Sequence, residues 1–191
     1  DGYARATGRP GVCVLISGPG LFNAATAIAQ ARADSVPMLV ISGVASVHDL
    51  GMRRGTLHEL PDQHATAASF CRSSATVLDP SNLPELVARA FALFRTQRPG
   101  PAHIEIPLDL MGAPIAATPV RPAAVLGAPG PHPEVLSRAA ELLSSADQPL
   151  MVLGGGAQNA AEAVAALAEA ADCPALNTVN GKGVLPMEHP L

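Results

Sequence analysis

The segment ISGPGLFNAAT, residues 16–26, joins an apolar run to an alanine-rich stretch through a Gly-Pro-Gly turn. The run that leads into it, residues 11–17, is continuously apolar, as expected of a parallel strand covered on both faces. In the alanine-rich stretch, Ala24, Ile28 and Ala31 recur at helical spacing and form one stripe. We therefore predict a strand, a tight glycine turn and a helix, which is the repeating unit of parallel α/β sheets.

The same alternation recurs further along the chain. Residues 37–43 and 102–110 have the composition of two more strands, and a helix is predicted from Leu83, with Pro80 and Ser81 as start signals. We predict an α/β fold with parallel sheets flanked by helices, of the Rossmann-like or flavodoxin-like kind.

A proline-rich segment, residues 116–132, interrupts this pattern and is predicted to be an extended linker, because proline disfavours helices and central strands. Beyond it the alternation restarts, with helices predicted over 134–145 and 160–171, a buried strand over 149–153 and a further strand over 173–179.

The chain begins at Asp1 rather than at a methionine, and its last residues close no predicted element. We therefore expect two incomplete domains, residues 1–115 and 133–191, from a longer protein.

Composition excludes some classes of function. The 191 residues are 48% apolar and carry a formal net charge of −4, and this weak acidity argues against a nucleic-acid partner. No apolar run approaches the roughly 20 residues that span a bilayer, so no membrane partner is expected. Cys13, Cys71 and Cys173 lack the spacing of a metal site or disulfide framework, which indicates buried thiols in a reducing, cytoplasmic compartment.

Two glycine turns are candidate binding sites. In SGPGLFN no Lys-Ser/Thr pair follows Gly20, and Asn23 stands where a dinucleotide fingerprint has its third glycine. Pro19 has a fixed φ and no N–H, so it suits a rigid wall better than an anion cradle. The second turn, GGGAQN at 154–159, also lacks the dinucleotide spacing. For both turns a purely structural role stays open.

Several segments together resemble the thiamine-diphosphate-dependent enzymes of the acetolactate synthase-like family. They cover nearly the whole chain, in the right order: DGYARATG (1–8), GPGxxN (18–23), DSVPMLVISG (34–43), RPGPAHIEIPLDL (98–110) and NGKGVLPMEHPL (180–191). The resemblance implies that residues 1–115 are the later part of a pyrimidine-binding domain and residues 133–191 the first part of a central domain.

The resemblance also implies a chemistry. Thiamine diphosphate would bind between the subunits of a homodimer or homotetramer, with Mg²⁺ held by a C-terminal domain outside this chain. A small-molecule 2-oxo acid would be decarboxylated, and the product released or joined to a second carbonyl by a lyase or transferase reaction. The family's catalytic glutamate would lie before Asp1, so this chain alone is expected to be inactive.

Site residues carry over by position in the family's motifs. Ile16, Pro19 and Asn23 correspond to residues that line the aminopyrimidine pocket. The family's Phe-Gln-Glu segment falls on residues 57–59, where this chain has Leu57 and His58. Histidine can donate, accept or transfer a proton, so His58 is a candidate catalytic residue; a solvent-facing loop histidine is the alternative.

The stretch LHELPDQ is also similar to relatives that decarboxylate a guanidino 2-oxo acid derived from arginine, and there Asp62 or Glu59 would face the cationic substrate. In the central domain, two loops match positions that contact FAD in acetolactate synthases. Their residues are Gly154, Gly155, Gly156, Asn159, Thr178, Val179 and Gly181. A protein without flavin, or a non-catalytic flavin- or nucleotide-binding module, remains an alternative.

Overall fold

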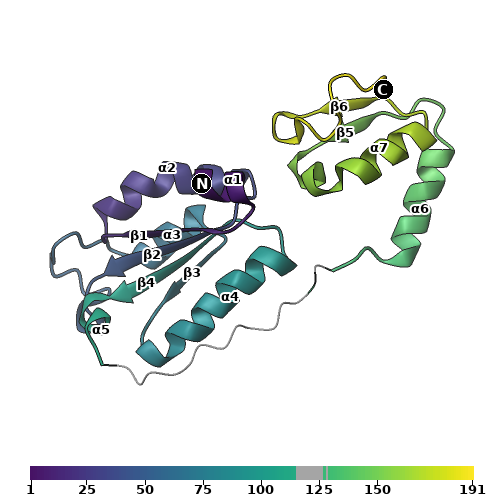
Figure 1. Cartoon of the computed structure of the whole chain (residues 1–191). Helices are drawn as coiled ribbons and strands as arrows, with labels where there is room; N and C mark the ends of the chain where they lie inside the picture. Colours follow the sequence, from purple (N-terminus) through teal and green to yellow (C-terminus); the bar gives the residue numbers. More distant parts are fainter. Residues whose placement is uncertain (115–126, 128) are drawn as a thin grey trace. The chain divides into compact units, whose positions relative to one another are not determined.

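The computed structural model describes residues 1–114, 127 and 129–191. The chain divides into two compact units, Asp1–Ala128 and Pro129–Leu191, and each is described by itself (Figure 1). Most of the predicted linker, residues 116–126 and 128, lies outside the described residues.

The first unit is built on a four-stranded, wholly parallel sheet with the strand order β1-β2-β4-β3. Its strands are β1 Gly11–Leu15, β2 Met38–Val44, β3 Ser73–Thr76 and β4 Pro101–Pro107. The register pairs Ser42 of β2 and Thr76 of β3 with Glu105 of the central β4. All four strands run in the same direction, so their carboxyl ends share one edge of the sheet.

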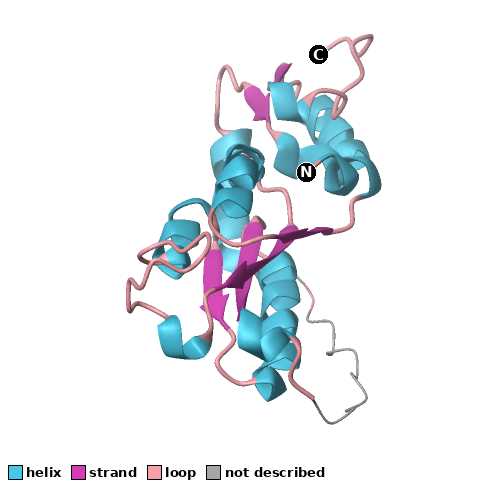
Figure 2. Cartoon of the chain, turned by 90° about the vertical axis from the view of Figure 1, so that its left-hand side faces the viewer, coloured by secondary structure: helices cyan, strands magenta, loops and turns pink. Residues whose placement is uncertain are grey.

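Helices lie on both faces of this sheet, as Figures 1 and 2 show. They are α1 Gly2–Thr7, α2 Pro19–Ala33, α3 Gln63–Phe70, α4 Leu83–Thr96 and the short α5 Leu108–Met111, with 3-10 turns η1 Val47–Asp49 and η2 Pro80–Asn82. On one face Leu21 and Ile28 of α2 and Ala67 of α3 pack on Val40 of β2. On the other face α4 packs through Ala90 on a second apolar cluster. The predicted α/β class with parallel sheets flanked by helices is confirmed.

Three details differ from prediction. The apolar run 11–17 is not covered on both faces: β1 is an edge strand, and its Val12 and Val14 side chains are exposed. The run 102–110 does not stay extended: β4 ends at Pro107, and α5 follows. The elements α1, α3 and β3 were not predicted; β3, Ser73–Thr76, is short and polar and carries no apolar signal.

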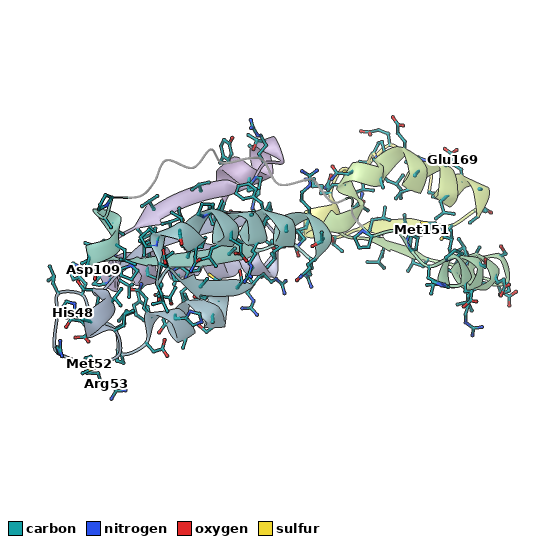
Figure 3. The ribbon with its side chains drawn as sticks, turned by 90° about the horizontal axis from the view of Figure 1, so that it is seen from below. His48, Met52, Arg53, Asp109, Met151 and Glu169 are labelled. Atoms are coloured by element: carbon teal, nitrogen blue, oxygen red, sulfur yellow. The ribbon has the colours of Figure 1, made fainter. Side chains whose placement is uncertain are left out.

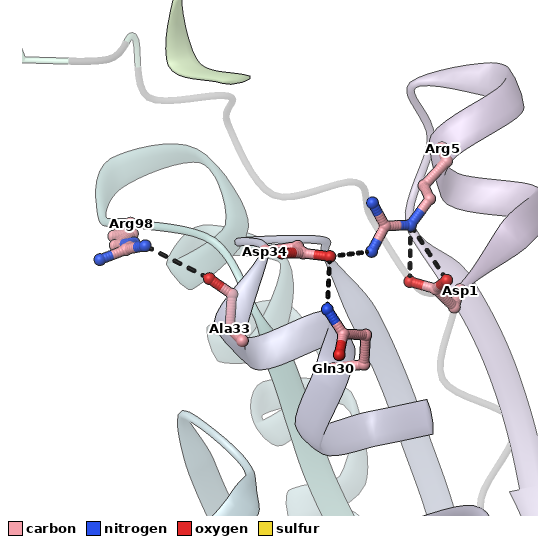
Figure 4. Close-up of polar contacts among 6 residues, drawn as sticks. All are labelled: Asp1, Arg5, Gln30, Ala33, Asp34 and Arg98. Carbon is pink, nitrogen blue, oxygen red and sulfur yellow. Dashed lines mark hydrogen bonds and ion pairs between the residues drawn. The ribbon is translucent and has the colours of Figure 1, made fainter. Parts of the chain in front are cut away.

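The DGYAR segment has a structural role in this unit (Figure 4). Arg5 of α1 contacts Asp1 at 3.0 Å and Asp34, just after α2, at 2.6 Å. Gln30 donates to the same Asp34 carboxylate at 2.8 Å, and Arg98 reaches the Ala33 carbonyl at 3.4 Å. Two of the segments that carry the family resemblance, 1–8 and 34–43, therefore meet through an ion pair.

The second unit contains a two-stranded parallel sheet. Its elements are α6 Pro133–Ser144, β5 Met151–Leu153, η3 Gly155–Ala160, α7 Ala161–Ala170, β6 Ala175–Asn177 and η4 Val179–Gly181. Leu153, Ala168, Val184 and Leu185 form its buried core. The prediction that β5 is wholly buried is wrong, since Val152 is 66% exposed.

Candidate active site

A cavity of about 250 Å³ lies at the carboxyl-terminal edge of the sheet in the first unit. Ser17 after β1, Val44 at the end of β2, Thr76 of β3 and Glu105 of β4 all line it. The rest of its wall comes from residues 45–64, between β2 and the start of α3. Open parallel α/β sheets bind ligands at this edge, so the cavity is the candidate active site.

The Gly-Pro-Gly turn, residues 18–20, is called the elbow below. It borders this cavity through the preceding residue, Ser17, and packs tightly against the segment that carries His58. Gly18 has φ +54°, and a Cβ on it would collide with the His58 carbonyl oxygen and lie 3.3 Å from the His58 Cβ. His58 itself has a left-handed backbone, with φ +62°. Only glycine fits at position 18, because of both its dihedral angle and its close neighbour.

The elbow is not a phosphate cradle. The Gly18 N–H, which would have to face an anion, donates to the Gln63 Oε1 at 2.8 Å, and the Gly20 N–H points to the Ser17 carbonyl at 3.4 Å. Pro19, the first residue of α2, has no N–H to offer. These contacts leave an exposed apolar surface at Ile16 and Pro19, which suits a flat ring better than a phosphate.

Gln63 is the most connected polar side chain of the site. Its Nε2 donates to the Gly43 carbonyl at 2.8 Å and lies 3.1 Å from both Ser42 Oγ and Glu105 Oε2. Glu105 is buried in the middle of the sheet, and its other oxygen accepts from Thr76 at 2.7 Å. A buried carboxylate therefore forms part of the cavity wall, held by two donors.

The polar contacts continue inward along β4. His103 is buried between two hydroxyls, with Ser42 Oγ 2.8 Å from its Nε2 and Ser74 Oγ 2.8 Å from its Nδ1. Burial, with a smaller contribution from His64, lowers the pKa of His103 to about 4. His103 is thus a neutral, hydrogen-bonded histidine near neutral pH and belongs to the support of the site.

His58 lines the cavity and is half-buried, which places it at the wall, while Leu57 is 82% exposed. Glu59 accepts from the Gly55 and Thr56 amides at 2.6 and 2.9 Å and so closes the turn before His58. Asp62 caps α3 by accepting from the Ala65 amide at 2.8 Å.

Charge in the cavity is mainly negative. Four carboxylates line it, namely Asp49, Glu59, Asp62 and Glu105. Arg54 pairs with Asp49 at 2.8 Å, but neither arginine nor lysine is among the described residues that line the cavity. Within residues 1–114, 127 and 129–191, no group of three or more His, Cys, Asp or Glu side chains is arranged to hold a metal ion.

The η1 turn and the loop that follows it lie at one end of the first unit. Figure 3 shows His48 of η1 there, with Met52 and Arg53 of the loop, on the same side as Asp109. Asp109 of α5 accepts from the Val47 amide at 3.1 Å, which ties α5 to η1. The exposed Met52 and Arg53 side chains lie outside the cavity wall.

The site residues expected from the sequence fall into separate groups. His58, Glu59 and Asp62 line the cavity, whereas Ile16 before the elbow, Pro19 on it and Asn23 in α2 are exposed outside the cavity wall. Gln63, His64 and Thr76 also line the cavity but are not predicted from the sequence, and neither is a role for Glu105. The DQ pair at 62–63 marks a helix start, but only the strand register reveals what Gln63 contacts.

In the second unit the two glycine loops contact each other. The Gln158 side chain donates to the Asn180 and Lys182 carbonyls at 3.0 and 3.1 Å. A Cβ on Gly181 would collide with the Leu153 carbonyl, and one on Gly155 would lie 3.2 Å from Asn180. Glycine is therefore required at position 181, whereas a side chain at position 155 would be a tight fit against Asn180.

The other predicted flavin contacts in this unit are more open. A Cβ on Gly154 or Gly156 would meet nothing within 4 Å. Asn159 is exposed, and Val179 is 94% exposed. Thr178 accepts from the Gly181 amide at 3.1 Å and caps η4. Gly154 and Gly156 therefore leave open space beside the backbone.

Comparison with known families matches both units. Residues 1–66 match the N-terminal TPP binding domain of thiamine pyrophosphate enzymes, and residues 136–191 match their central domain. The chain belongs to the thiamine pyrophosphate enzyme family.

Individual members of the thiamine pyrophosphate enzyme family match the chain over its full length. A probable 2-ketoarginine decarboxylase, AruI, of Pseudomonas aeruginosa is 52% identical over 194 residues, covering 100% of this chain and 34% of that protein. An acetolactate synthase of Arthrospira platensis is 38% identical over 198 residues, and the acetolactate synthase isozyme 1 large subunit of Escherichia coli K12 is 35% identical over 193. Each of these alignments covers 100% of this chain and 34% of the relative, so the chain spans about a third of the curated relatives' length.

Within the part of the chain that the structure describes, no helix is both long and apolar enough to cross a membrane.

Proposed function

We propose that this chain supplies one wall of the active site of a thiamine-diphosphate-dependent enzyme that decarboxylates a 2-oxo acid with a cationic guanidino tail. The observation that carries the proposal is the acidic cavity, whose wall holds Asp49, Glu59, Asp62 and Glu105. A carboxylate-lined cavity favours a cation over the small neutral side chain of pyruvate. The higher identity to a 2-ketoarginine decarboxylase than to the two acetolactate synthases supports the same choice.

The proposed domain arrangement follows the family. Residues 1–115 form the later part of the pyrimidine-binding domain, 116–132 the linker, and 133–191 the first part of the central domain. In the full-length enzyme, a cytoplasmic homodimer or homotetramer, Mg²⁺ and the diphosphate are held by a further domain.

Thiamine diphosphate, when bound, supplies the carbanion chemistry that releases CO₂ from a 2-oxo acid. The residues of this chain position the cofactor and select the substrate. Ile16 and Pro19 offer an apolar surface to the aminopyrimidine ring, and Asn23 offers an amide to its nitrogens. His58, at the cavity wall, donates a hydrogen bond or proton to the carbonyl end of the substrate. Glu59 or Asp62 faces the guanidinium group.

The activity is tested with the full-length enzyme, supplied with thiamine diphosphate and Mg²⁺. We expect kcat/KM for CO₂ release from the arginine-derived 2-oxo acid to exceed that for pyruvate by at least about tenfold, because a charged group gains more than about 1.4 kcal/mol in a complementary site. Acetolactate as the main product, with no turnover of the guanidino acid, would instead identify a synthase.

Two substitutions remove the charge of a cavity carboxylate while keeping its role as a hydrogen-bond acceptor. Asp62→Asn keeps an N-cap acceptor, and Glu59→Gln keeps an oxygen for the Gly55 and Thr56 amides. We expect either to raise KM for the guanidino acid about fivefold, as for a partly exposed ion pair of about 1 kcal/mol. KM for a neutral 2-oxo acid should not change. Glu85→Gln on α4, which removes an exposed carboxylate outside the cavity, is the matched control.

His58 is tested by His58→Gln, which restores the family's residue at that position. We expect a lower kcat with the guanidino acid and a changed product distribution. Unchanged kcat and product distribution would identify His58 as an ordinary loop histidine.

FAD is a second, independent proposal for the central domain, favoured by the open space at Gly154 and Gly156. Purified enzyme with bound FAD would show visible flavin absorbance. A colourless protein that releases no nucleotide on denaturation would exclude both FAD and a nucleotide-binding module.

A further inference from the structure

We propose that Gln63 is a positioning residue that holds the Gly-Pro-Gly elbow and the His58 loop, residues 55–62, in a single shared arrangement. It builds on the proposed function in one respect, namely that the cofactor binds at this elbow.

The Gln63 side chain connects segments that are far apart in the sequence. It is 4% exposed and is the first residue of α3. Its Oε1 accepts from the Gly18 amide of the elbow at 2.8 Å, and its Nε2 donates to the Gly43 carbonyl of β2 at 2.8 Å. The same Nε2 lies 3.1 Å from the Glu105 carboxylate of β4. One amide group therefore joins the elbow, two strands and α3.

The His58 loop is held at two points, by its chain connection to Gln63 and by packing on Gly18, the residue that Gln63 binds. It leads directly into Gln63 along the chain, with Asp62 capping α3 at 2.8 Å. It also packs on the elbow, because the His58 carbonyl occupies the space beside Gly18. Displacing the Gln63 side chain therefore frees the Gly18 amide, on which the His58 carbonyl packs, and loosens the end of the His58 loop where it enters α3.

The contacts demand an amide at this position. Gln63 must accept at one atom and donate at the other, because its neighbours are an N–H on one side and a carbonyl and a carboxylate on the other. A methionine fills a similar volume but makes neither kind of bond. An ionised glutamate accepts at both oxygens and would face Glu105 as a second buried negative charge.

The test compares Gln63→Met and Gln63→Glu in the full-length enzyme with Gln30→Met and Gln30→Glu. Gln30 of α2 is an exposed glutamine that also donates to a carboxylate, Asp34, at 2.8 Å, so the chemical changes are matched. We measure the thiamine diphosphate Kd, and amide hydrogen exchange in residues 16–22 and 56–62 without cofactor.

We expect Gln63→Met to raise the Kd for thiamine diphosphate by about tenfold to 100-fold, because several buried groups lose their partners. Exchange should accelerate in both segments together, and the Gln30 variants should stay within about twofold of wild type. A Kd and exchange rates equal to those of Gln30→Met would overturn the proposal.

The glutamate variant adds a pH readout that a merely structural role would not produce. Two carboxyls about 3 Å apart share one proton, so one has a raised pKa. We expect the binding defect of Gln63→Glu to shrink as the pH falls, when the protonated carboxyl introduced at position 63 can donate to Glu105 again. The defect of Gln63→Met should persist at every pH. A pH-independent defect in Gln63→Glu would contradict the assigned contacts.

Other titratable groups face this position. His103 shares the Ser42 hydroxyl with Gln63, and His64 of α3 and His58, Glu59 and Asp62 of the loop share its cavity wall; all are present in wild type. The pH profile is therefore taken as the ratio of the variant Kd to the wild-type Kd. If wild-type enzyme fails to bind thiamine diphosphate, the proposed function fails, while the exchange data still decide whether Gln63 couples the two segments.

Discussion

Gly18→Ala is expected to disrupt the elbow and the His58 loop together. Two costs add. The backbone at Gly18, with φ +54° and ψ −103°, lies outside the regions that a side chain allows, which costs about 1–3 kcal/mol. In addition, the new methyl group would collide with the His58 carbonyl oxygen, so backbone rather than a flexible side chain must move. We expect a total of about 3 kcal/mol or more, the upper end of the dihedral cost with the collision added.

Gly8→Ala is the matched control. Gly8 ends α1 with φ +68°, and a Cβ added there has nothing within 4 Å, so alanine meets only the dihedral cost, about 1 kcal/mol. The assay is amide hydrogen exchange of the full-length enzyme.

Protection of residues 56–62 should fall about 100-fold in Gly18→Ala, since about 1.4 kcal/mol corresponds to a factor of ten. In Gly8→Ala the same segment should keep its wild-type protection. Equal protection of residues 56–62 in the two variants would refute the inferred contact between the elbow and the His58 loop.

Three further outcomes are expected. The free energy of unfolding should fall by about 2 kcal/mol between about pH 6.5 and pH 5. The reason is that His103 stays neutral in the folded protein, with a pKa of about 4, while in the unfolded chain it takes up a proton below about pH 6.5. In guanidinium titrations, the His103→Gln variant should not show this loss of stability. Burial raises the pKa of the Cys71 thiol to about 12, so only about one Cys71 thiol in 10,000 is ionised at about pH 8. A thiol reagent should therefore label Cys71 only after the protein unfolds. Gln158→Ala should speed hydrogen exchange in residues 178–183 by about fivefold, since two exposed hydrogen bonds to Asn180 and Lys182 are lost; unchanged exchange would show that Gln158 does not join the loops.

The apolar strands could be predicted from the sequence because burial leaves a local composition signal. The runs that became β2 and β4 are apolar over most of their length, and the stripe of Ala24, Ile28 and Ala31 faces the core or its edge as predicted. By contrast, β3 has four half-buried residues of small or polar type, and its pairing with β4 depends on non-local contacts.

The site could be predicted only in part, for the same reason. Similarity of the segment 57–62 to family motifs pointed to His58, Glu59 and Asp62, and all three line the cavity. Gln63 and Glu105 lie 42 positions apart in the chain and meet because β4 pairs with β2 and α3 covers the same face. No spacing rule along the chain contains that information.

The pairing of Gln63 with Glu105 also determines how a mutant library for a new substrate should be built. Randomising Glu105 alone removes an acceptor from the Gln63 amide, which keeps the Gly43 carbonyl, and from the half-buried Thr76 hydroxyl, a loss of about 0.5–1.5 kcal/mol for each hydrogen bond. Single-site screens would therefore score useful exchanges at Glu105 as failures of folding. Codon sets that vary positions 76 and 105 in the same clone would recover them, since a new matched pair of side chains can replace both partners in one step, while Gln63 is kept because it also holds the Gly18 amide and the Gly43 carbonyl.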